Sequence, residues 1–168
     1  MRIYLPSTVS GVRDALATGA VPVRSGVGFA VTGSLRTEYP GWSDEELEYL
    51  AMLDASRASL RLLAAAADEP WLRVVVAADI DDALAAPRPD RDRAVVAVTQ
   101  ATVPWKRVAS VHLDGADATD AVRAAAAVID AADLGDADAE FALGSAEDFD
   151  LAWYAPGEIR YLLGEPGE

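Results

Sequence analysis

The only histidine, His112, is the residue of this sequence best suited to acid–base chemistry. Ser110 precedes it by two residues and Asp114 follows it by two, within the strand-like run VASVHLD at 108–114. Because alternate residues of a strand point to the same face, the three side chains are expected to lie side by side. An imidazole beside a carboxylate can act as a general base or supply half of a metal site.

The motifs that usually accompany such chemistry are absent from the sequence. It contains no G-x-S-x-G, no H-E-x-x-H and no second histidine, and these patterns mark serine nucleophiles and zinc sites. It also contains no cysteine, which excludes disulfides, thiolate catalysis and cysteine-ligated metal centres. A structural role is therefore the preferred interpretation of His112, and we expect neither a metal nor a cofactor.

Polar residues that follow strand-like runs supply a second set of candidate catalytic groups. In an open α/β sheet, sites gather beyond the carboxyl ends of the strands. An enzyme that works with carboxylates, with or without a divalent metal, would have its site there. The candidates are Ser7, Ser34, Asp79, His112 and Asp114, with Thr8 and Thr32 beside the first two. Such residues also cap helices, and capping is the preferred interpretation.

A run of carboxylates at 136–147 partly matches a calcium-binding loop. Asp136, Asp138, Glu140 and Glu147 fall at positions 1, 3, 5 and 12 of the loop pattern. The sixth position, where the loop needs glycine for a sharp turn, is Phe141. The alanine-rich flanks favour a continuous helix with its acidic side chains in water, and we expect no calcium site.

Half of the acidic residues lie in the last third of the chain. Residues 114–168 contain fourteen of the 28 Asp and Glu side chains and only two bases, Arg123 and Arg160, so this third carries −12 of the formal −14. Such a field repels nucleic-acid phosphates and anionic lipids and attracts basic protein surfaces or cations. We therefore expect a basic protein surface as partner, and neither nucleic acid nor a membrane.

The same third of the chain carries aromatic residues among its acids. A docking surface for a basic partner would combine the acidic side chains with exposed rings, because aromatic anchors ringed by charge are typical of interfaces. Its residues would be Asp136, Asp138, Glu140, Trp153 and Tyr154. For the two rings themselves, core packing is the preferred interpretation, because large aromatic side chains are mostly buried. As a further alternative, the acidity serves only solubility or salt adaptation. The composition favours a non-enzymatic interaction or regulatory protein over a carboxylate enzyme.

Five runs of residues have the composition of the β-strands that would position these groups. They are Arg2–Pro6, Val27–Thr32, Leu72–Asp79, Arg93–Gln100 and Val108–Asp114. The third and fourth runs are almost continuous valine and alanine, which is the pattern expected of strands covered on both faces.

Helical patterns alternate with these strands. The clearest spans Asp44–Ala67, where Ser43 and Glu46 form the S-x-x-E capping box. On this helix Asp54 lies within pairing reach of Arg57. Further helices are expected at Thr8–Thr18, Asp117–Ala132 and Asp136–Ala146, a loop at Ala86–Asp92, and a strand or short helix at Leu151–Leu163.

This order of elements predicts a single α/β domain over residues 1–168. We expect a mixed, mostly covered sheet of about five strands with helices on its faces. The acidic, aromatic segment 133–168 is expected to belong to the same domain. No run approaches the roughly 18–20 apolar residues of a membrane span, and the N-terminus has no uninterrupted apolar stretch. The sequence therefore predicts a cytoplasmic protein.

Several blocks of the sequence, taken in order, resemble one known family. The blocks are MRIYLPST, FAVTGSLR, EELEYLAMLDASRASLRLL, RVVVAADI, VASVHLDGAD, AADLGDADAEFA and EDFDLAWYAPGEI. They resemble a set of small acidic actinobacterial proteins known only as a domain of unknown function. The resemblance implies a cytoplasmic bacterial protein of one domain, and it supplies no activity, cofactor or catalytic residue.

Overall fold

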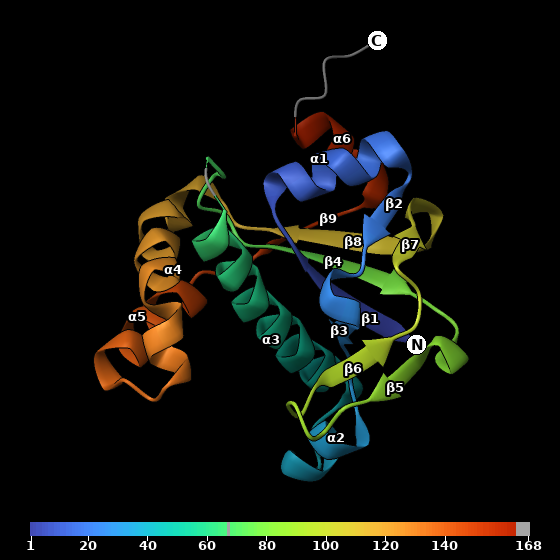
Figure 1. Cartoon of the computed structure of the whole chain (residues 1–168), viewed down its shortest axis with the longest axis horizontal. Helices are drawn as coiled ribbons and strands as arrows, with labels where there is room; N and C mark the ends of the chain where they lie inside the picture. The colour runs from blue at the N-terminus through green and yellow to red at the C-terminus, as the bar shows by residue number, and fades with distance from the viewer. Residues whose placement is uncertain (67, 164–168) are drawn as a thin grey trace.

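The main sheet has seven strands, in the order β5-β6-β3-β1-β4-β8-β9, within the residues that the computed structural model describes, 1–66 and 68–163 (Figure 1). The strands are β1 Arg2–Ser7, β3 Val27–Phe29, β4 Val74–Asp79, β5 Ala85–Pro87, β6 Val95–Val98, β8 Val108–Leu113 and β9 Ala152–Tyr154. Two further strands, β2 Ala20–Pro22 and β7 Thr102–Pro104, pair in a separate small sheet. All five predicted strand runs are confirmed, as β1, β3, β4, β6 and β8.

The sheet differs from the prediction in size and in direction. Among the described residues it has seven strands where the sequence predicts five, since β5 and β9 are three-residue strands too short to show a period. β5 also takes in the start of the segment Ala86–Asp92, which was predicted to be a loop. Neighbouring strands of the described sheet pair antiparallel, so the expectation of a mixed sheet was wrong. As a result, strand carboxyl ends are divided between opposite margins of the sheet.

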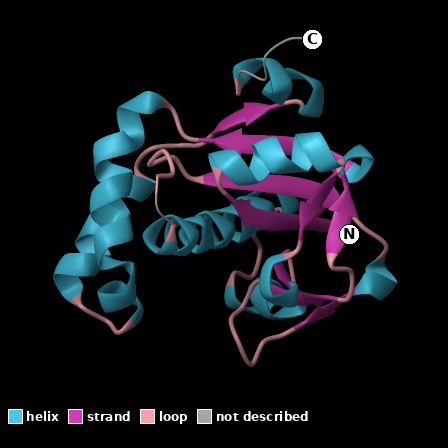
Figure 2. Cartoon of the chain, turned by 45° about the horizontal axis from the view of Figure 1, so that its top comes forward, coloured by secondary structure: helices cyan, strands magenta, loops and turns pink. Residues whose placement is uncertain are grey.

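Helices cover both faces of the sheet (Figure 2). Their bounds are α1 Val9–Thr18, α2 Gly33–Glu38, α3 Asp44–Ala65, α4 Thr119–Asp133, α5 Ala137–Glu147 and α6 Pro156–Leu162, with 3-10 turns at Arg24–Gly26, Asp82–Leu84, Trp105–Arg107 and Ala116–Ala118. On one face, residues of α1 and α6 join a core cluster with alternate residues of β1, β4 and β8. On the other face, α2 and α3 pack on the remaining residues of β1 and β4. The predicted helices are confirmed, although Ala67, the expected end of the long one, lies outside the described residues.

The two valine-rich strands, β4 and β6, are buried and lie inside the sheet, as their composition predicts, although β6 is next to the edge strand β5. Every residue from Val74 to Ala78 in β4 is buried, and Val95, Val96 and Val98 of β6 are buried as well. Because alternate side chains enter the two core clusters, β4 is apolar on both faces.

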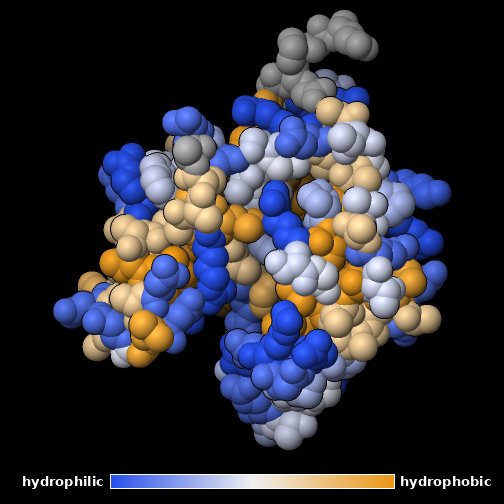
Figure 3. Space-filling view, in the orientation of Figure 1, coloured by the Kyte–Doolittle hydropathy of each residue, from blue (hydrophilic) through white to orange (hydrophobic). Residues whose placement is uncertain are grey.

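The α4–α5 hairpin packs against the C-terminal half of α3 and buries a third apolar cluster, which contains Leu60 and Leu63 of α3. Ion pairs flank this contact, with Arg61 held by Asp133 at 2.7 Å and Arg57 placed 3.3 Å from Glu147. Asp54, the expected partner of Arg57, instead pairs with Arg93, which precedes β6, at 3.2 Å. Part of the acidic third therefore neutralises arginines of the chain's own long helix. Hydrophobic residues remain visible on the surface of the hairpin (Figure 3).

The capping box of α3 is formed as predicted. The Ser43 hydroxyl accepts a hydrogen bond from the Glu46 N–H at 3.2 Å, and the Glu46 carboxylate accepts one from the Ser43 N–H at 2.7 Å. Ser43→Ala is expected to lower the free energy of unfolding by about 0.5–2 kcal/mol, because a helix N–H loses its partner. Urea denaturation measures the change. Ser34→Ala is the control, because Thr32 rather than Ser34 caps α2, and equal effects of the two substitutions would contradict the assignment.

None of the helices in the part of the chain just described has the length and apolar character needed to cross a membrane.

Candidate functional site

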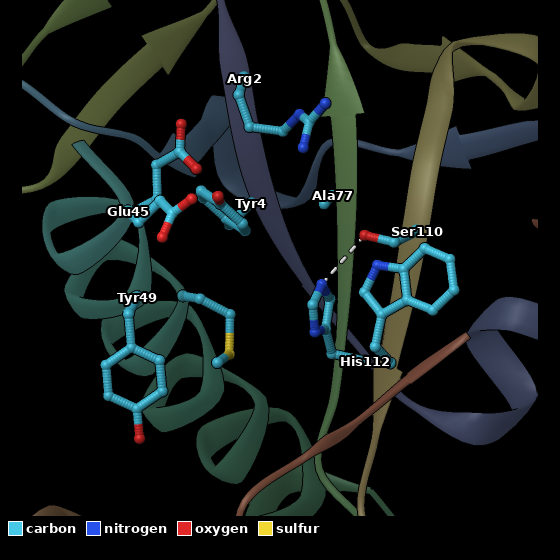
Figure 4. Close-up of a pocket in the computed structure, with 10 residues that line it drawn as sticks. Arg2, Tyr4, Glu45, Tyr49, Ala77, Ser110 and His112 are labelled. Carbon is cyan, nitrogen blue, oxygen red and sulfur yellow. Dashed lines mark hydrogen bonds between the residues drawn. The ribbon is translucent and has the colours of Figure 1, made fainter. Parts of the chain in front are cut away.

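A pocket of about 260 Å³ opens between the N-terminal half of α3 and the sheet (Figure 4). Helix α3 supplies one wall, and β1, β4, β8 and β9 supply the floor and the other wall. The lining side chains are Glu45, Glu48, Tyr49 and Met52 from the helix, and Arg2, Tyr4, Ala77, Ser110, His112 and Trp153 from the strands.

Strand register explains why residues far apart in sequence meet here. Trp153 of β9 lies opposite His112 of β8, which lies opposite Val75 of β4. In the next row, Ser110 lies opposite Ala77, and the register shifts immediately beyond this pair, as at a β-bulge. Residues opposite one another share a face of the sheet, so these side chains form two adjacent rows facing α3.

The predicted neighbourhood of His112 is half correct. Its Nε2 lies 3.0 Å from the Ser110 hydroxyl, and Figure 4 shows both side chains at the floor of the pocket. Burial lowers the pKa of His112, and the positive charge of Arg2 lowers it further. The imidazole is therefore mostly neutral at pH 7, and in the tautomer protonated at Nδ1 its Nε2 accepts a hydrogen bond from the Ser110 hydroxyl.

Asp114, the third residue expected beside His112, is committed elsewhere. Its carboxylate accepts hydrogen bonds at 2.8 Å from the backbone N–H, the Nε and an Nη of Arg73. Both side chains are fully buried. The arginine also donates to the Phe149 carbonyl at 2.7 Å, which ties the chain before β9 to the start of β4. Asp114 therefore supports the fold, and no hydrogen bond between Asp114 and His112 is formed among the described residues.

The other strand-end candidates do not converge with His112. Asp79 ends β4 and binds Arg2 through two hydrogen bonds, at 2.7 and 3.1 Å. It lies at the opposite end of β4 from Arg73, the partner of Asp114. Ser7 is buried at the end of β1, and Ser34 is exposed in the first turn of α2. The antiparallel sheet thus separates groups that a parallel sheet would have gathered.

Capping explains some of these polar residues. Thr8 accepts a hydrogen bond from the Gly11 N–H and caps α1, and Thr32 accepts one from the Leu35 N–H and caps α2, both at 3.1 Å. Asp136 caps α5 in the same way through the Ala139 N–H, so the predicted helix at the calcium-like run is confirmed. Within residues 1–66 and 68–163, no three His, Cys, Asp or Glu side chains are grouped closely enough to hold a metal ion.

The two aromatic residues of β9 point to opposite faces of the sheet. Trp153 is 60% exposed and lines the pocket, so the interpretation that it packs in the core was wrong. Tyr154 is half-buried against the core cluster under α1 and α6, where the core interpretation is correct. Trp153 and Tyr154 therefore do not form one patch.

Only some of the charged side chains that line the pocket have an ion-pair partner. Arg2 is paired with Asp79, whereas no ion pair within the described residues engages Glu45 or Glu48. Burial, and then the charge of Glu48, raises the pKa of Tyr4 to about 12, so this phenol remains neutral. The pocket therefore combines aromatic rings with two carboxylates that form no ion pair among the described residues, beside the guanidinium of Arg2, which Asp79 already neutralises. Such an arrangement suits a cation.

Sequence reasoning missed the helical wall of this pocket. Glu45, Glu48, Tyr49 and Met52 recur at the three- and four-residue steps that place side chains on one stripe of a helix. The apolar face of α3 was found by the same periodicity, but nothing in the sequence indicates which strands lie opposite the polar stripe.

The lowered pKa of His112 predicts a pH effect on stability. Its unfolded-state pKa is 6.5 and its folded-state pKa is lower, so the unfolded chain binds the proton more tightly. The contribution of neutral His112 to the free energy of unfolding is therefore fully present above pH 6.5. It declines as the pH falls from 6.5 to the folded-state pKa. We expect the free energy of unfolding to fall more between pH 7.5 and 5.5 in the wild type than in His112→Gln, as measured with urea. Parallel profiles would contradict the burial of a neutral imidazole.

Comparison with models of known protein families identifies one family that covers most of the chain. Residues 1–163 match the family of unknown function DUF6912. The chain belongs to that family. No curated protein and no solved structure matches the chain. Membership in DUF6912 confirms the resemblance to a family of unknown function and assigns no activity.

Proposed function

We propose that this DUF6912 protein is a non-enzymatic, cytoplasmic interaction protein that binds a basic protein partner, with one arginine side chain of the partner in the pocket between α3 and β9. The observation that carries the proposal is the 60% exposure of Trp153 beside two unpaired glutamates. Tryptophan is among the residue types most enriched at the binding anchors of interfaces.

The chemistry of the pocket favours a cation as its occupant. A guanidinium over an indole ring gains about 0.5–2 kcal/mol, depending on how far it is desolvated. Glu45 and Glu48 offer carboxylate oxygens, which bind a guanidinium through charge-assisted hydrogen bonds. Arginine suits this site better than lysine, because its planar group stacks on a ring and donates in its own plane at the same time.

The acidic surface of α5 has a secondary role in this proposal. Asp136 is already used as a helix cap, and Glu140 lies 3.5 Å from Arg57. With Asp138, these residues would contribute to a long-range field that speeds the encounter with a basic partner. The same field disfavours nucleic acids and anionic membranes as partners.

A titration with N-acetyl-arginine amide, followed by NMR, tests the proposal. N-acetyl-citrulline amide is the matched control ligand, because it has nearly the same shape and no charge. The arginine compound is expected to shift resonances of the pocket residues, and these shifts should weaken as salt is added. The citrulline compound should leave the resonances unchanged. Equal shifts with both ligands, or none at the pocket with either, would end the proposal.

Matched protein variants separate the pocket from general acidity. Glu45→Gln combined with Glu48→Gln removes two charges from the pocket wall. Asp120→Asn combined with Asp130→Asn removes two charges from exposed positions of α4. We expect the first pair to weaken arginine binding at least tenfold and the second to change it less than twofold, because a local contact dominates over the distant field at physiological salt.

A further inference from the structure

Strand β9 is an open edge of the sheet. It stands at one end of the strand order and, in the described residues, pairs with β8 alone (Figures 1 and 2). The edge at the other end, β5, carries Pro87, which cannot donate a backbone hydrogen bond. β9 has neither proline nor lysine, and Ala152 and Trp153 are both exposed. A free edge of this kind is a template for another strand.

The register of β9 directs an added strand toward the pocket. Val75, His112 and Trp153 form one row across β4, β8 and β9, on the face covered by α3. A residue of an added strand opposite Trp153 would continue this row, with its Cβ about 4.5–5.5 Å from that of Trp153. A long side chain at that position would lie against the indole ring and reach the cavity that Glu45 and Glu48 line.

The charged residues around β9 indicate which charge a strand added to its edge would carry. Asp148 and Asp150 precede it, Glu158 follows it, and all three are exposed. Tyr49 donates a hydrogen bond to Asp150 at 3.3 Å, which joins this acidic surface to the pocket. A second copy of the chain would bring the same acids face to face, and like charges in register are unfavourable. A basic segment meets the complementary charge.

We propose that the partner binds as an extended basic segment that adds a strand to the free edge of β9 and places an arginine opposite Trp153. The inference rests on the proposed function and adds the conformation of the partner. Main-chain hydrogen bonds to β9 would supply affinity, and the arginine in the pocket would supply specificity.

Backbone-methylated peptides test this mode of binding on the intact protein. The probe is the acetylated and amidated peptide Thr-Val-Arg-Val-Thr, whose affinity is measured by calorimetry. One derivative carries N-methyl groups at both valines, and the other carries them at the arginine and the last threonine. Alternate N–H groups of a strand point to opposite edges. Strand addition therefore predicts that one derivative binds about tenfold more weakly, through two lost hydrogen bonds, while the other stays within about threefold of the parent.

The outcomes separate the two proposals. If both derivatives bind as well as the parent, or if the parent binds no better than N-acetyl-arginine amide, strand addition is wrong while the pocket proposal stands. If neither the peptide nor the arginine amide binds, the pocket proposal is wrong, and strand addition, which rests on it, is wrong as well. Replacing the arginine of the peptide with glutamate should abolish binding, and retained binding would also overturn the inference.

Discussion

Replacing Asp114 with alanine is expected to lower the free energy of unfolding by about 3–5 kcal/mol, because the substitution leaves a buried arginine charge without its partner. The side chains of Arg73 and Asp114 are both fully buried, with 0% exposure to solvent. Their three hydrogen bonds, at 2.8 Å each, hold the start of β4 against the chain after β8. Urea denaturation measures the loss.

The exposed ion pair between Arg61 and Asp133 provides the control for this prediction. Its side chains are 43% and 36% exposed, so Asp133→Ala should cost about 1 kcal/mol or less. The double variant Arg73→Met, Asp114→Leu removes both buried charges and should be more stable than Asp114→Ala alone. If the single and double variants are equally unstable, the unpaired charge is not the cause.

Replacing Trp153 with alanine is expected to weaken binding of the arginine peptide by about 30-fold or more, the effect of losing an interface anchor worth at least 2 kcal/mol. Because the ring is 60% exposed, the free energy of unfolding should change by less than about 1 kcal/mol, whereas a core tryptophan would cost about 3–5 kcal/mol. Calorimetry and urea denaturation of one variant measure both quantities.

Trp42 supplies the matched control. It is 44% exposed, packs beside Tyr39 with ring centroids 4.7 Å apart, and is not among the residues that line the pocket. Trp42→Ala should therefore leave the affinity for the peptide unchanged. A large loss of stability in Trp153→Ala, or an equal loss of affinity in both variants, would show that Trp153 is not a specific anchor.

The composition of single elements made much of the fold predictable. β4 and β6 could be recognised because a strand covered on both faces must be apolar throughout, and α3 because its capping box and apolar period coincide. For the segment that contains β9, the sequence predicts only a strand or short helix at Leu151–Leu163, because the three residues of β9 cannot display a period. Its place in the sheet depends on β8, which is some forty residues away in the sequence.

The candidate site was less predictable than the fold. The neighbourhood of Ser110 and His112 follows from two-residue spacing alone and was found. The role of Asp114 was missed, because its partner Arg73 precedes another strand and is brought close only by sheet pairing. Likewise, the antiparallel order separates Asp79 from Asp114, and strand order is a property of the whole fold rather than of any local pattern.

Contact between the bound arginine and the β9 tryptophan is the most direct test of the proposed function. The measurement is a set of intermolecular NOEs between the side-chain methylene protons of N-acetyl-arginine amide and the protein, with the Trp153 indole resonances assigned through Trp153→Phe. The pocket proposal predicts NOEs to the indole of Trp153 and to the ring of Tyr49, which line the same cavity. NOEs confined to residues of α4 and α5, or a bound arginine that shows no NOE to Trp153, would contradict it.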